Sequence, residues 1–445
     1  MGKKNKKEKG RGAEKTAQKM LKKQNKGKKD DDLEDLEAMI AQFKEADKKK
    51  TTFNEEKVSH PSARLNMSVC AHPDKDELLI FGGEYYNGKK IAMYNDLFVY
   101  NIKKNEWSKR FVPNPPSPRS AHQAVVVSKE GGQMWIFGGE FSSPNNAQFH
   151  HFKDLFVLNL KKHEWKQVKA ENGPTPRSGH RMCVHNRNIF VFGGFHESTR
   201  DFIYFNDCYS FNINDHVWTK IVANGSVPSP RSACQLATAP NGILVVGGYS
   251  KTKLKKDVEK GTAHADMYLL TQEANSKWKW SLVKQSGQKP WPRSGFSVAQ
   301  ISQQRAVLFG GCRDEDEEEN LQSQFFNSMS CLDVVSNRWF NFELRNSKRD
   351  ESSEDEMDHD GGTRSASGAY PCPRLNAAVA VKKGIMYLYG GMLEHKDQQI
   401  TLNDLWAIDV KKVDAWKELV KSDDTAADWQ EEASGWFFLF SLCKI

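Results

Sequence analysis

The chain is dominated by short apolar runs separated by polar turn residues, and this pattern repeats six times between residues 64 and 416. A representative run is Ile189-Phe190-Val191-Phe192, which is β-branched or aromatic and is closed by a glycine pair. Runs of this length and composition predict β-strands, and glycine at their ends permits a close backbone approach. The six glycine pairs are Gly82-Gly83, Gly138-Gly139, Gly193-Gly194, Gly247-Gly248, Gly310-Gly311 and Gly390-Gly391.

Three further marks accompany each glycine pair in a fixed order. An arginine stands 16 to 19 residues before each pair, at Arg64, Arg119, Arg177, Arg231, Arg293 and Arg374. An apolar run begins 13 to 18 residues after each glycine pair, at Asp96, Asp154, Asp207, Asp266, Ser328 and Asp404. A tryptophan follows that run, at Trp107, Trp165, Trp218, Trp278, Trp339 and Trp416. The spacings predict four short strands per unit, with the marks building the fold and doing no chemistry.

Four-stranded units with these marks resemble kelch repeats, which stack radially as the blades of a β-propeller. The resemblance implies an all-β, six-bladed propeller. The chain also resembles the kelch domain-containing protein 4 family through Met1-Gly2-Lys3-Lys4, the segments 12–17 and 32–37, Phe81–Tyr86 and 195–201. That family is intracellular and has no assigned catalytic activity, so the resemblance implies a binding protein in the cytoplasm, the nucleus or both, with the nucleolus as a further candidate.

Charge divides the chain into three parts. Residues 1–50 are expected to form a largely disordered basic arm and a short amphipathic helix. Residues 51–416 are expected to form the propeller, with an acidic insertion at about 345–372, and residues 417–445 are expected to form an atypical tail. Residues 3–29 are rich in Lys and nearly free of acids, so they are expected either to contact nucleic-acid phosphates or to act as an import signal. Leu33, Leu36, Met39, Ile40 and Phe43 recur at helical spacing, and this helix would dock either on the propeller or on a partner.

The sequence contains no pattern typical of an enzyme, a metal site or a cofactor site. Gly83–Lys89 matches the start of a phosphate-binding loop, but Lys90 replaces the metal-binding hydroxyl and no helix follows. His122 and His180 occupy a repeat position that Met67, Cys234, Phe296 and Ala377 fill elsewhere, which indicates packing. The eight cysteines show no zinc spacing, and no apolar stretch is long enough to cross a bilayer.

In an antiparallel meander, the loops after the glycine pairs share one face with the connections between units, and loops on a rigid scaffold carry function. The residues expected to bind a protein partner are Glu84, Tyr85, Tyr86, Glu140, Phe141, Phe195, His196, Arg200 and Tyr249. Charged residues expected at the same rim are Lys253, Lys255, Lys256, Glu317, Glu318 and Asp355, and acids three residues on make Ser352 and Ser353 candidate phosphorylation sites.

These features favour a non-enzymatic protein-binding scaffold that uses the long-loop rim of a propeller. Two alternatives remain open. One is an RNA- or ribosome-associated factor that binds through the basic arm. The other is a substrate adaptor of a ubiquitin ligase. The sequence specifies neither the partner nor an oligomeric state.

Overall fold

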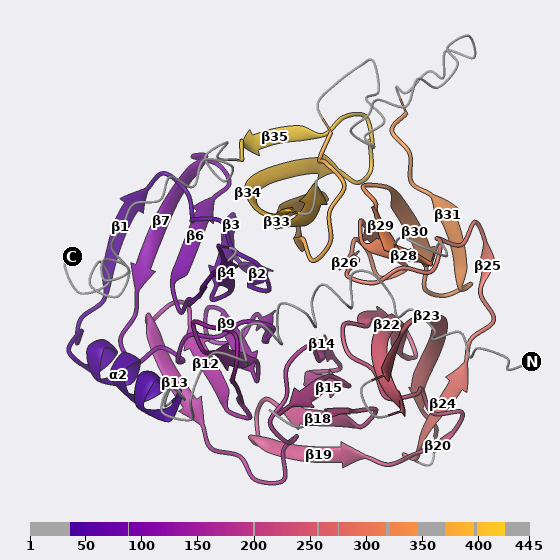
Figure 1. The fold of residues 1–445 in the computed structure, drawn as a ribbon, viewed down its shortest axis with the longest axis horizontal. Helices are drawn as coiled ribbons and strands as arrows, with labels where there is room; N and C mark the ends of the chain where they lie inside the picture. Colours follow the sequence, from indigo (N-terminus) through magenta and orange to yellow (C-terminus); the bar gives the residue numbers. More distant parts are fainter. Residues whose placement is uncertain are drawn as a thin grey trace, which may run out of the picture.

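The computed structural model describes residues 36–87, 89–198, 201–255, 258–274, 276–316, 321–345, 370–395 and 398–422. Six antiparallel sheets are arranged as blades around a central axis, as Figure 1 shows. The fold is therefore the all-β, six-bladed propeller that the repeat predicts. Each blade is one consecutive stretch of chain, and its strands run in order from the axis outward.

Each of the first three blades contains four main strands. Blade 1 consists of β2 (Ser68–Ala71), β3 (Glu77–Phe81), β6 (Leu97–Asn101) and β7 (Glu106–Phe111). Blade 2 consists of β8 (Gln123–Val127), β9 (Gln133–Phe137), β12 (Leu155–Asn159) and β13 (Glu164–Val168). Blade 3 consists of β14 (Arg181–His185), β15 (Asn188–Phe192), β18 (Cys208–Asn212) and β19 (Val217–Ile221).

The other three blades repeat this arrangement. Blade 4 consists of β21 (Gln235–Ala239), β22 (Gly242–Lys255), β23 (Val258–Gln272) and β24 (Trp278–Leu282). Blade 5 consists of β26 (Ser297–Gln300), β27 (Arg305–Phe309), β30 (Met329–Asp333) and β31 (Arg338–Asn341). Blade 6 consists of β32 (Ala378–Lys382), β33 (Ile385–His395), β34 (Gln398–Asp409) and β35 (Lys417–Val420).

Three blades carry a fifth strand on their outer edge. β1 (Asn54–Val58) pairs antiparallel with β7, whereas β20 (Ala223–Gly225) and β25 (Ser286–Gly287) pair parallel with β24 and β31. The two parallel strands belong to the connections that lead into blades 4 and 5. They cover outer edges whose backbone groups would otherwise be unpaired.

The core lies between the blades, where each sheet packs its apolar face on the next. In blade 3 the repeat tryptophan, Trp218, is buried and packs against Phe137 of blade 2 with ring centroids 5.5 Å apart. The equivalent residue of blade 4 is Trp280, which contacts Phe192 at 5.5 Å, and not Trp278, which is only half-buried. The assignment of Trp278 to this position is wrong, because the turn at residues 273–277 is longer than the corresponding turns of blades 1, 2, 3 and 5 and shifts the register.

The glycine pairs make room for the backbone of the following blade. Gly138 has φ 63°, and a Cβ at this residue would lie 2.7 Å from the Arg177 carbonyl oxygen of blade 3. The N–H of Gly139 donates to the same carbonyl oxygen at 2.9 Å. A side chain at Gly138 would therefore push the two blades apart.

A ring of left-handed residues surrounds the axis, two positions after each repeat arginine. Its members are Asn66, Ala121, Gly179, Ala233, Gly295 and Asn376, with φ between 50° and 64°. Backbone hydrogen bonds join four of the successive pairs; for example, the Ala121 N–H donates to the Asn66 carbonyl oxygen and the Ala233 N–H to that of Gly179, at 2.9 and 2.8 Å. At these positions the backbone itself links neighbouring blades.

Ala233 is strained in this ring, because an L-residue with a Cβ disfavours positive φ. We expect Ala233→Gly to raise the free energy of unfolding by roughly 0.5–1 kcal/mol, measured by urea denaturation. The reverse change, Gly179→Ala, is the matched control. It should destabilise the protein, because its Cβ would lie 3.1 Å from the Phe195 ring. An Ala233→Gly variant no more stable than wild type would contradict this account of the ring.

Side-chain contacts close the ring between blade 6 and blade 1. Tyr389 and Leu405 of blade 6 pack in one buried cluster with Ile80 and Trp107 of blade 1. At the turns, Lys382 donates to the carbonyl oxygens of His72 and Pro73. No strand of blade 1 completes the described sheet of blade 6, so packing and polar side-chain contacts hold this junction.

Helix α2 (Leu36–Lys48) docks on the outside of blades 1 and 2 (Figure 1). Leu36 and Ile40 are buried against Met93, Phe141 and Phe152. At its end, the Asn95 amide donates to Asp47 at 2.8 Å. Of the two dockings that the sequence left open, the structure shows the one on the propeller. No helix among the described residues is long and apolar enough to span a membrane.

Replacing Ile40 with aspartate should release α2 without unfolding the propeller. Ile40 is 5% exposed, and burying an aliphatic side chain of this size contributes about 2–3 kcal/mol. A helix of 13 residues is only marginally stable by itself, so losing this contribution should be enough to undock it. We expect limited proteolysis to cleave residues 36–48 of Ile40→Asp rapidly, with an unchanged thermal transition of the ring. Ala41→Asp adds the same charge on the exposed side of α2 and should remain protected. Equal protection of both variants would contradict the docking.

Candidate partner-binding face

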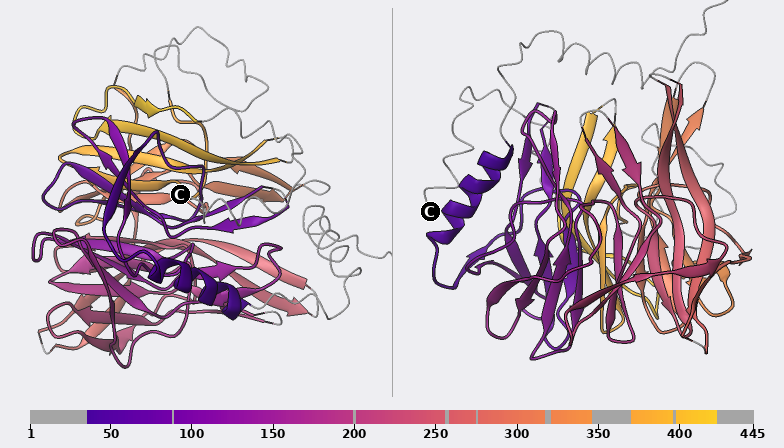
Figure 2. Two further views of the ribbon diagram at one scale, coloured as in Figure 1. Left: turned by 90° about the vertical axis from the view of Figure 1, so that its left-hand side faces the viewer. Right: turned by 90° about the horizontal axis from the view of Figure 1, so that it is seen from below.

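Hairpins project from one face of the ring, directly after the glycine pairs. Four are separate two-stranded sheets, namely β4–β5 (Glu84–Tyr86, Ile91–Met93), β10–β11 (Glu140–Ser142, Phe149–His151), β16–β17 (Phe195–Glu197, Phe202–Tyr204) and β28–β29 (Cys312–Asp316, Leu321–Phe325). In blades 4 and 6 the hairpins are continuations of β22–β23 and β33–β34. Figure 2 shows these extensions rising from the same end of the blades. The segments expected as loops are thus ordered hairpins in the described residues, and we call this surface the hairpin face.

Glu84 and Glu140 follow the glycine pairs of blades 1 and 2 and link neighbouring blades. Glu84 accepts hydrogen bonds from the Asn66 amide at 2.7 Å and from the Ser120 hydroxyl at 3.1 Å. Glu140 accepts one from the Ser178 hydroxyl of blade 3 at 2.8 Å. Burial, the nearby Glu84 carboxylate and Glu197 raise the pKa of Glu140 to about 8. Burial also raises the pKa of Glu84.

Two histidines and a phenylalanine continue this cluster into blade 3. The His151 ring lies 4.5 Å from the His196 ring and 5.7 Å from the Phe195 ring, between centroids. The Glu197 N–H donates to His151 Nε2 at 3.0 Å, and His151 Nδ1 lies 3.5 Å from the Glu140 carboxylate. Burial, together with His196, lowers the pKa of His151 to about 4. The structure thus brings together Glu140, Phe195 and His196, which the sequence analysis selected.

The other selected aromatic residues differ in accessibility. Tyr86 is exposed, Tyr85 and Tyr249 are half-buried, and Phe141 is 2% exposed. Phe141 packs beneath α2 against Phe43, with ring centroids 6.0 Å apart. A partner therefore cannot contact Phe141 while α2 is docked. Tyr86 is the aromatic residue of this set that is most open to a partner.

Lys253 lies at a contact between neighbouring hairpins. Its ammonium is 2.7 Å from the Asp201 carboxylate and lies 5.3 Å from the centre of the Phe202 ring, both in blade 3. Several selected residues fall outside the described residues or have side chains outside them. These are Arg200, Lys255, Lys256, Glu317, Glu318, Ser352, Ser353 and Asp355, together with the arm 3–29.

The returning strands of the hairpins contribute residues that the sequence analysis did not select. Ile203 of β17 is 57% exposed, and its neighbours Phe202 and Tyr204 pack edge to face at 5.7 Å. The sequence does carry a signal for these returning strands. It is a three-residue apolar run between the glycine pair and the next blade strand, as in Phe202-Ile203-Tyr204 and Ile91-Ala92-Met93. Each run pairs with the residues that follow the glycine pair. Such short strands are hard to separate from loops by periodicity.

The two repeat histidines pack as the sequence predicts. His122 and His180 are at most 1% exposed, and each packs edge to face on a phenylalanine of the preceding blade, Phe81 and Phe137. Burial lowers the pKa of His122 to about 3 and that of His180 well below its ordinary value. Within the described ranges, no three His, Cys, Asp or Glu residues are grouped as a metal would require.

A cavity of about 440 Å³ lies away from the hairpin face. It opens at the turns between blades 2 and 3 and is lined partly by Val126, Lys129, Val184 and Arg187. The candidate residues of the hairpin face are not among those that line it. The hairpin face therefore presents a broad surface of projecting strands, which suits a macromolecule.

Comparisons with known proteins agree with this architecture. The family model of the KLHDC2/KLHL20/DRC7 Kelch-repeats domain matches residues 66–311 and 259–437. The solved structure titled "Structure of YjhT" superposes with a TM-score of 0.53 at 13% identity, over 81% of this chain and 98% of that one, which shows the fold alone.

Two curated relatives are similar over most of this chain, and a third over less than half of it. Host cell factor of Drosophila melanogaster is 26% identical over 76% of this chain and 22% of the relative. Host cell factor 2 of Homo sapiens is 24% identical over 83% of this chain and 45% of the relative. The leucine-zipper-like transcriptional regulator 1 homolog of Drosophila melanogaster is 29% identical over 42% of this chain and 18% of the relative. The chain thus spans less than half the length of these relatives.

The match of the family model covers all six blades, from the start of β2 to beyond β35. The repeat arginines and glycine pairs that define the units are placed at equivalent positions in the blades, as are the tryptophans once Trp280 replaces Trp278 in blade 4. The chain belongs to the family of the KLHDC2/KLHL20/DRC7 Kelch-repeats domain.

Proposed function

We propose that this protein is a non-enzymatic scaffold that binds a protein partner on the hairpin face. The observation that carries the proposal is the row of hairpins, which presents exposed apolar side chains from different blades on one face of the ring. Tyr86 of blade 1 is 39% exposed and Ile203 of blade 3 is 57% exposed. Aromatic and apolar residues of this kind form the energetic centres of protein interfaces.

Three further observations support the proposal. The family match and the likeness to the host cell factors place the chain among kelch propellers. The motifs of segments 1–4, 12–17 and 32–37 favour, within these propellers, the kelch domain-containing protein 4 group. The seven cysteines among the described residues are free, which supports action in the cytoplasm or nucleus.

A matched pair of variants tests the proposal. The combination of Tyr86→Ser and Ile203→Asp alters exposed positions of the hairpin face, so it should leave folding intact. We expect it to reduce the amount of co-purified partner, quantified by mass spectrometry, at least tenfold, because the interface loses two anchor side chains.

The control is Val335→Asp, a residue that is 56% exposed in the turn between β30 and β31, at the opposite end of the blades. It adds one charge at a position of the same exposure as Ile203. Equal recovery of partners by the two variants would count against the hairpin face. Recovery of a cullin with wild type would support the narrower role of ubiquitin-ligase adaptor.

A further inference from the structure

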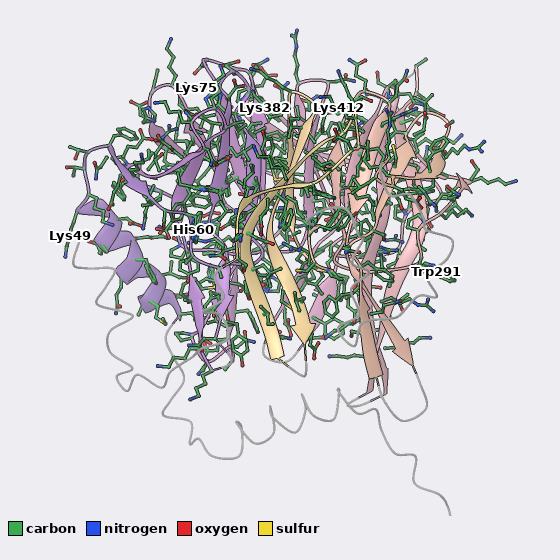
Figure 3. The ribbon with its side chains drawn as sticks, turned by 90° about the horizontal axis from the view of Figure 1, so that it is seen from above. Lys49, His60, Lys75, Trp291, Lys382 and Lys412 are labelled. Atoms are coloured by element: carbon green, nitrogen blue, oxygen red, sulfur yellow. The ribbon has the colours of Figure 1, made fainter. Side chains whose placement is uncertain are left out.

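The face opposite the hairpins carries lysines in a pattern that differs from blade to blade. It is formed by the turns between the first and second strands and between the third and fourth strands of each blade. In Figure 3, Lys75, Lys382 and Lys412 lie together at this end of the ring, away from the long hairpins. We call the turns of blades 6, 1 and 2 the lysine sector, since these three blades are neighbours in the ring.

The lysine sector has a Lys-Lys pair at one fixed turn position in all three blades. The pairs follow the third strand and are Lys103-Lys104, Lys161-Lys162 and Lys411-Lys412. The same position holds Asn214-Asp215 in blade 3 and Val335-Ser336 in blade 5. The turns between the first two strands add Lys75, Lys129, Lys382 and Lys383 in the sector, and Arg187 in blade 3.

The turn itself does not require lysine. In blade 2 the Asn159 side chain accepts hydrogen bonds from the N–H groups of Lys161 and Lys162, at 3.1 and 2.9 Å. Asn212 makes the same contacts with Asn214 and Asp215 in blade 3, at 2.8 and 3.2 Å. The Asn or Asp before the pair therefore shapes the turn, and the two side chains that follow are free to vary. The charge of the sector is a property separate from the fold.

Part of this charge is compensated within the sector, and part is not. Asp76 pairs with Lys103 at 3.1 Å and with Lys383 at 2.6 Å. Lys129 and Lys382 donate to backbone carbonyl oxygens. The other lysines have no carboxylate within 4 Å among the described residues, and all of them are exposed; they are Lys75, Lys104, Lys161, Lys162, Lys411 and Lys412.

The chemistry of the sector favours a polyanion with regularly spaced charges over a folded protein. Lysine is depleted at the centres of protein interfaces, which instead contain aromatic or apolar anchors. The described sector turns contain no exposed large apolar side chain. At its margin, Phe53 is 40% exposed and stacks on His163 with ring centroids 4.1 Å apart, which gives a flat surface beside Lys162. Ammonium groups contact phosphates as point charges, and an aromatic surface stacks bases.

We infer that the lysine sector binds the phosphate backbone of a nucleic acid, independently of base sequence. This site is separate from the basic arm 3–29 and lies on the face opposite the proposed protein-binding surface. A protein bound on the hairpins would leave the sector open. The ring could then hold a protein and a nucleic acid at the same time.

Two variants of the full-length protein with the same loss of charge test this inference. The sector variant combines Lys161→Gln, Lys162→Gln, Lys411→Gln and Lys412→Gln. The control variant combines Lys220→Gln, Lys277→Gln, Lys284→Gln and Lys289→Gln, which lie in blades 3 and 4 and in the connection to blade 5. Both keep the basic arm. The probe is a fluorescein-labelled single-stranded 20-mer of deoxythymidine, titrated by anisotropy at several salt concentrations.

The sector variant should bind the probe at least tenfold more weakly at low salt. The slope of its log affinity against log salt should become less steep by about 3, because each of the four lost phosphate contacts contributes ~0.7. The control variant should stay within about twofold of wild type. An equal change in both variants would overturn the inference, because net charge and the arm would then explain the binding. Polyglutamate serves as a second probe in the same titration. If the sector variant bound polyglutamate more weakly but the 20-mer unchanged, the surface would bind an acidic protein, and the inference would also be overturned.

Discussion

Replacing Asp207 with serine should destabilise the propeller by about 3–5 kcal/mol, the cost of leaving a buried charge without its partner. The Arg177 guanidinium is fully buried and donates to Asp207 Oδ1 at 2.6 Å and Oδ2 at 3.2 Å. It also donates to the Gly193 carbonyl oxygen at 3.0 Å, so one side chain joins the start of the blade to its glycine pair. Urea denaturation measures the loss, and a change below about 1 kcal/mol would contradict this role.

Blade 5 provides a natural control for this prediction. Its repeat arginine, Arg293, faces Ser328 where the other five blades have aspartate, and donates to the serine hydroxyl at 3.1 Å. Burial without a carboxylate lowers the pKa of Arg293 to about 10. We therefore expect Ser328→Asp to stabilise the protein, with a gain smaller than the loss in Asp207→Ser because Arg293 is the less completely buried arginine. Destabilisation by Ser328→Asp would show that blade 5 cannot accommodate the pair.

Replacing Glu140 with glutamine should stabilise the protein above neutral pH. The pKa of Glu140 is raised from 4.5 to about 8, so the folded state holds its proton more tightly than the unfolded chain. The stability that protonated Glu140 contributes is present below pH 4.5 and is lost as the pH rises through 8. At pH 9 the cost of the buried carboxylate is roughly 5 kcal/mol, and Glu140→Gln removes it. Glutamine can still accept the hydrogen bond from Ser178.

The measurement compares thermal or urea unfolding of wild type and Glu140→Gln between pH 6.5 and 9. We expect the gap between the two proteins to widen with pH in this window. His122 and His151 have pKa values lowered to about 3 and 4, so the stability that they contribute is present above pH 6.5 and is lost as the pH falls. Their titration therefore lies on the acid side. A gap that stays constant from pH 6.5 to 9 would contradict the raised pKa of Glu140.

The repeat marks predicted the blades because each mark has one physical task. The glycine pair admits the backbone of the next blade, and the arginine binds the carbonyl oxygen of the first glycine, as Arg177 does with Gly193. Such tasks depend on residue type, so they are visible in one sequence. Trp278 was misassigned because two tryptophans lie close together, and only the register Leu270↔Trp280 selects between them.

Other features depend on the path of the chain and left no signal in the sequence. β20 is Ala223-Asn224-Gly225 and β25 is Ser286-Gly287, which have low strand propensity. They are strands only because each connection passes along the outer edge of the next blade. The accessibility of Phe141 was likewise hidden, since α2 precedes it by about a hundred residues. The lysine sector becomes visible only when ring closure places blade 6 beside blade 1.

Hydrogen–deuterium exchange on the full-length protein with its captured partner tests most directly whether the hairpin face is the binding surface. The account predicts slower exchange in the peptides that contain Glu84–Met93 and Phe195–Tyr204, with no change in the turn that contains Val335. The ring strands should exchange equally slowly with and without the partner. Protection confined to the turn face, with the hairpins unchanged, would contradict the central claim.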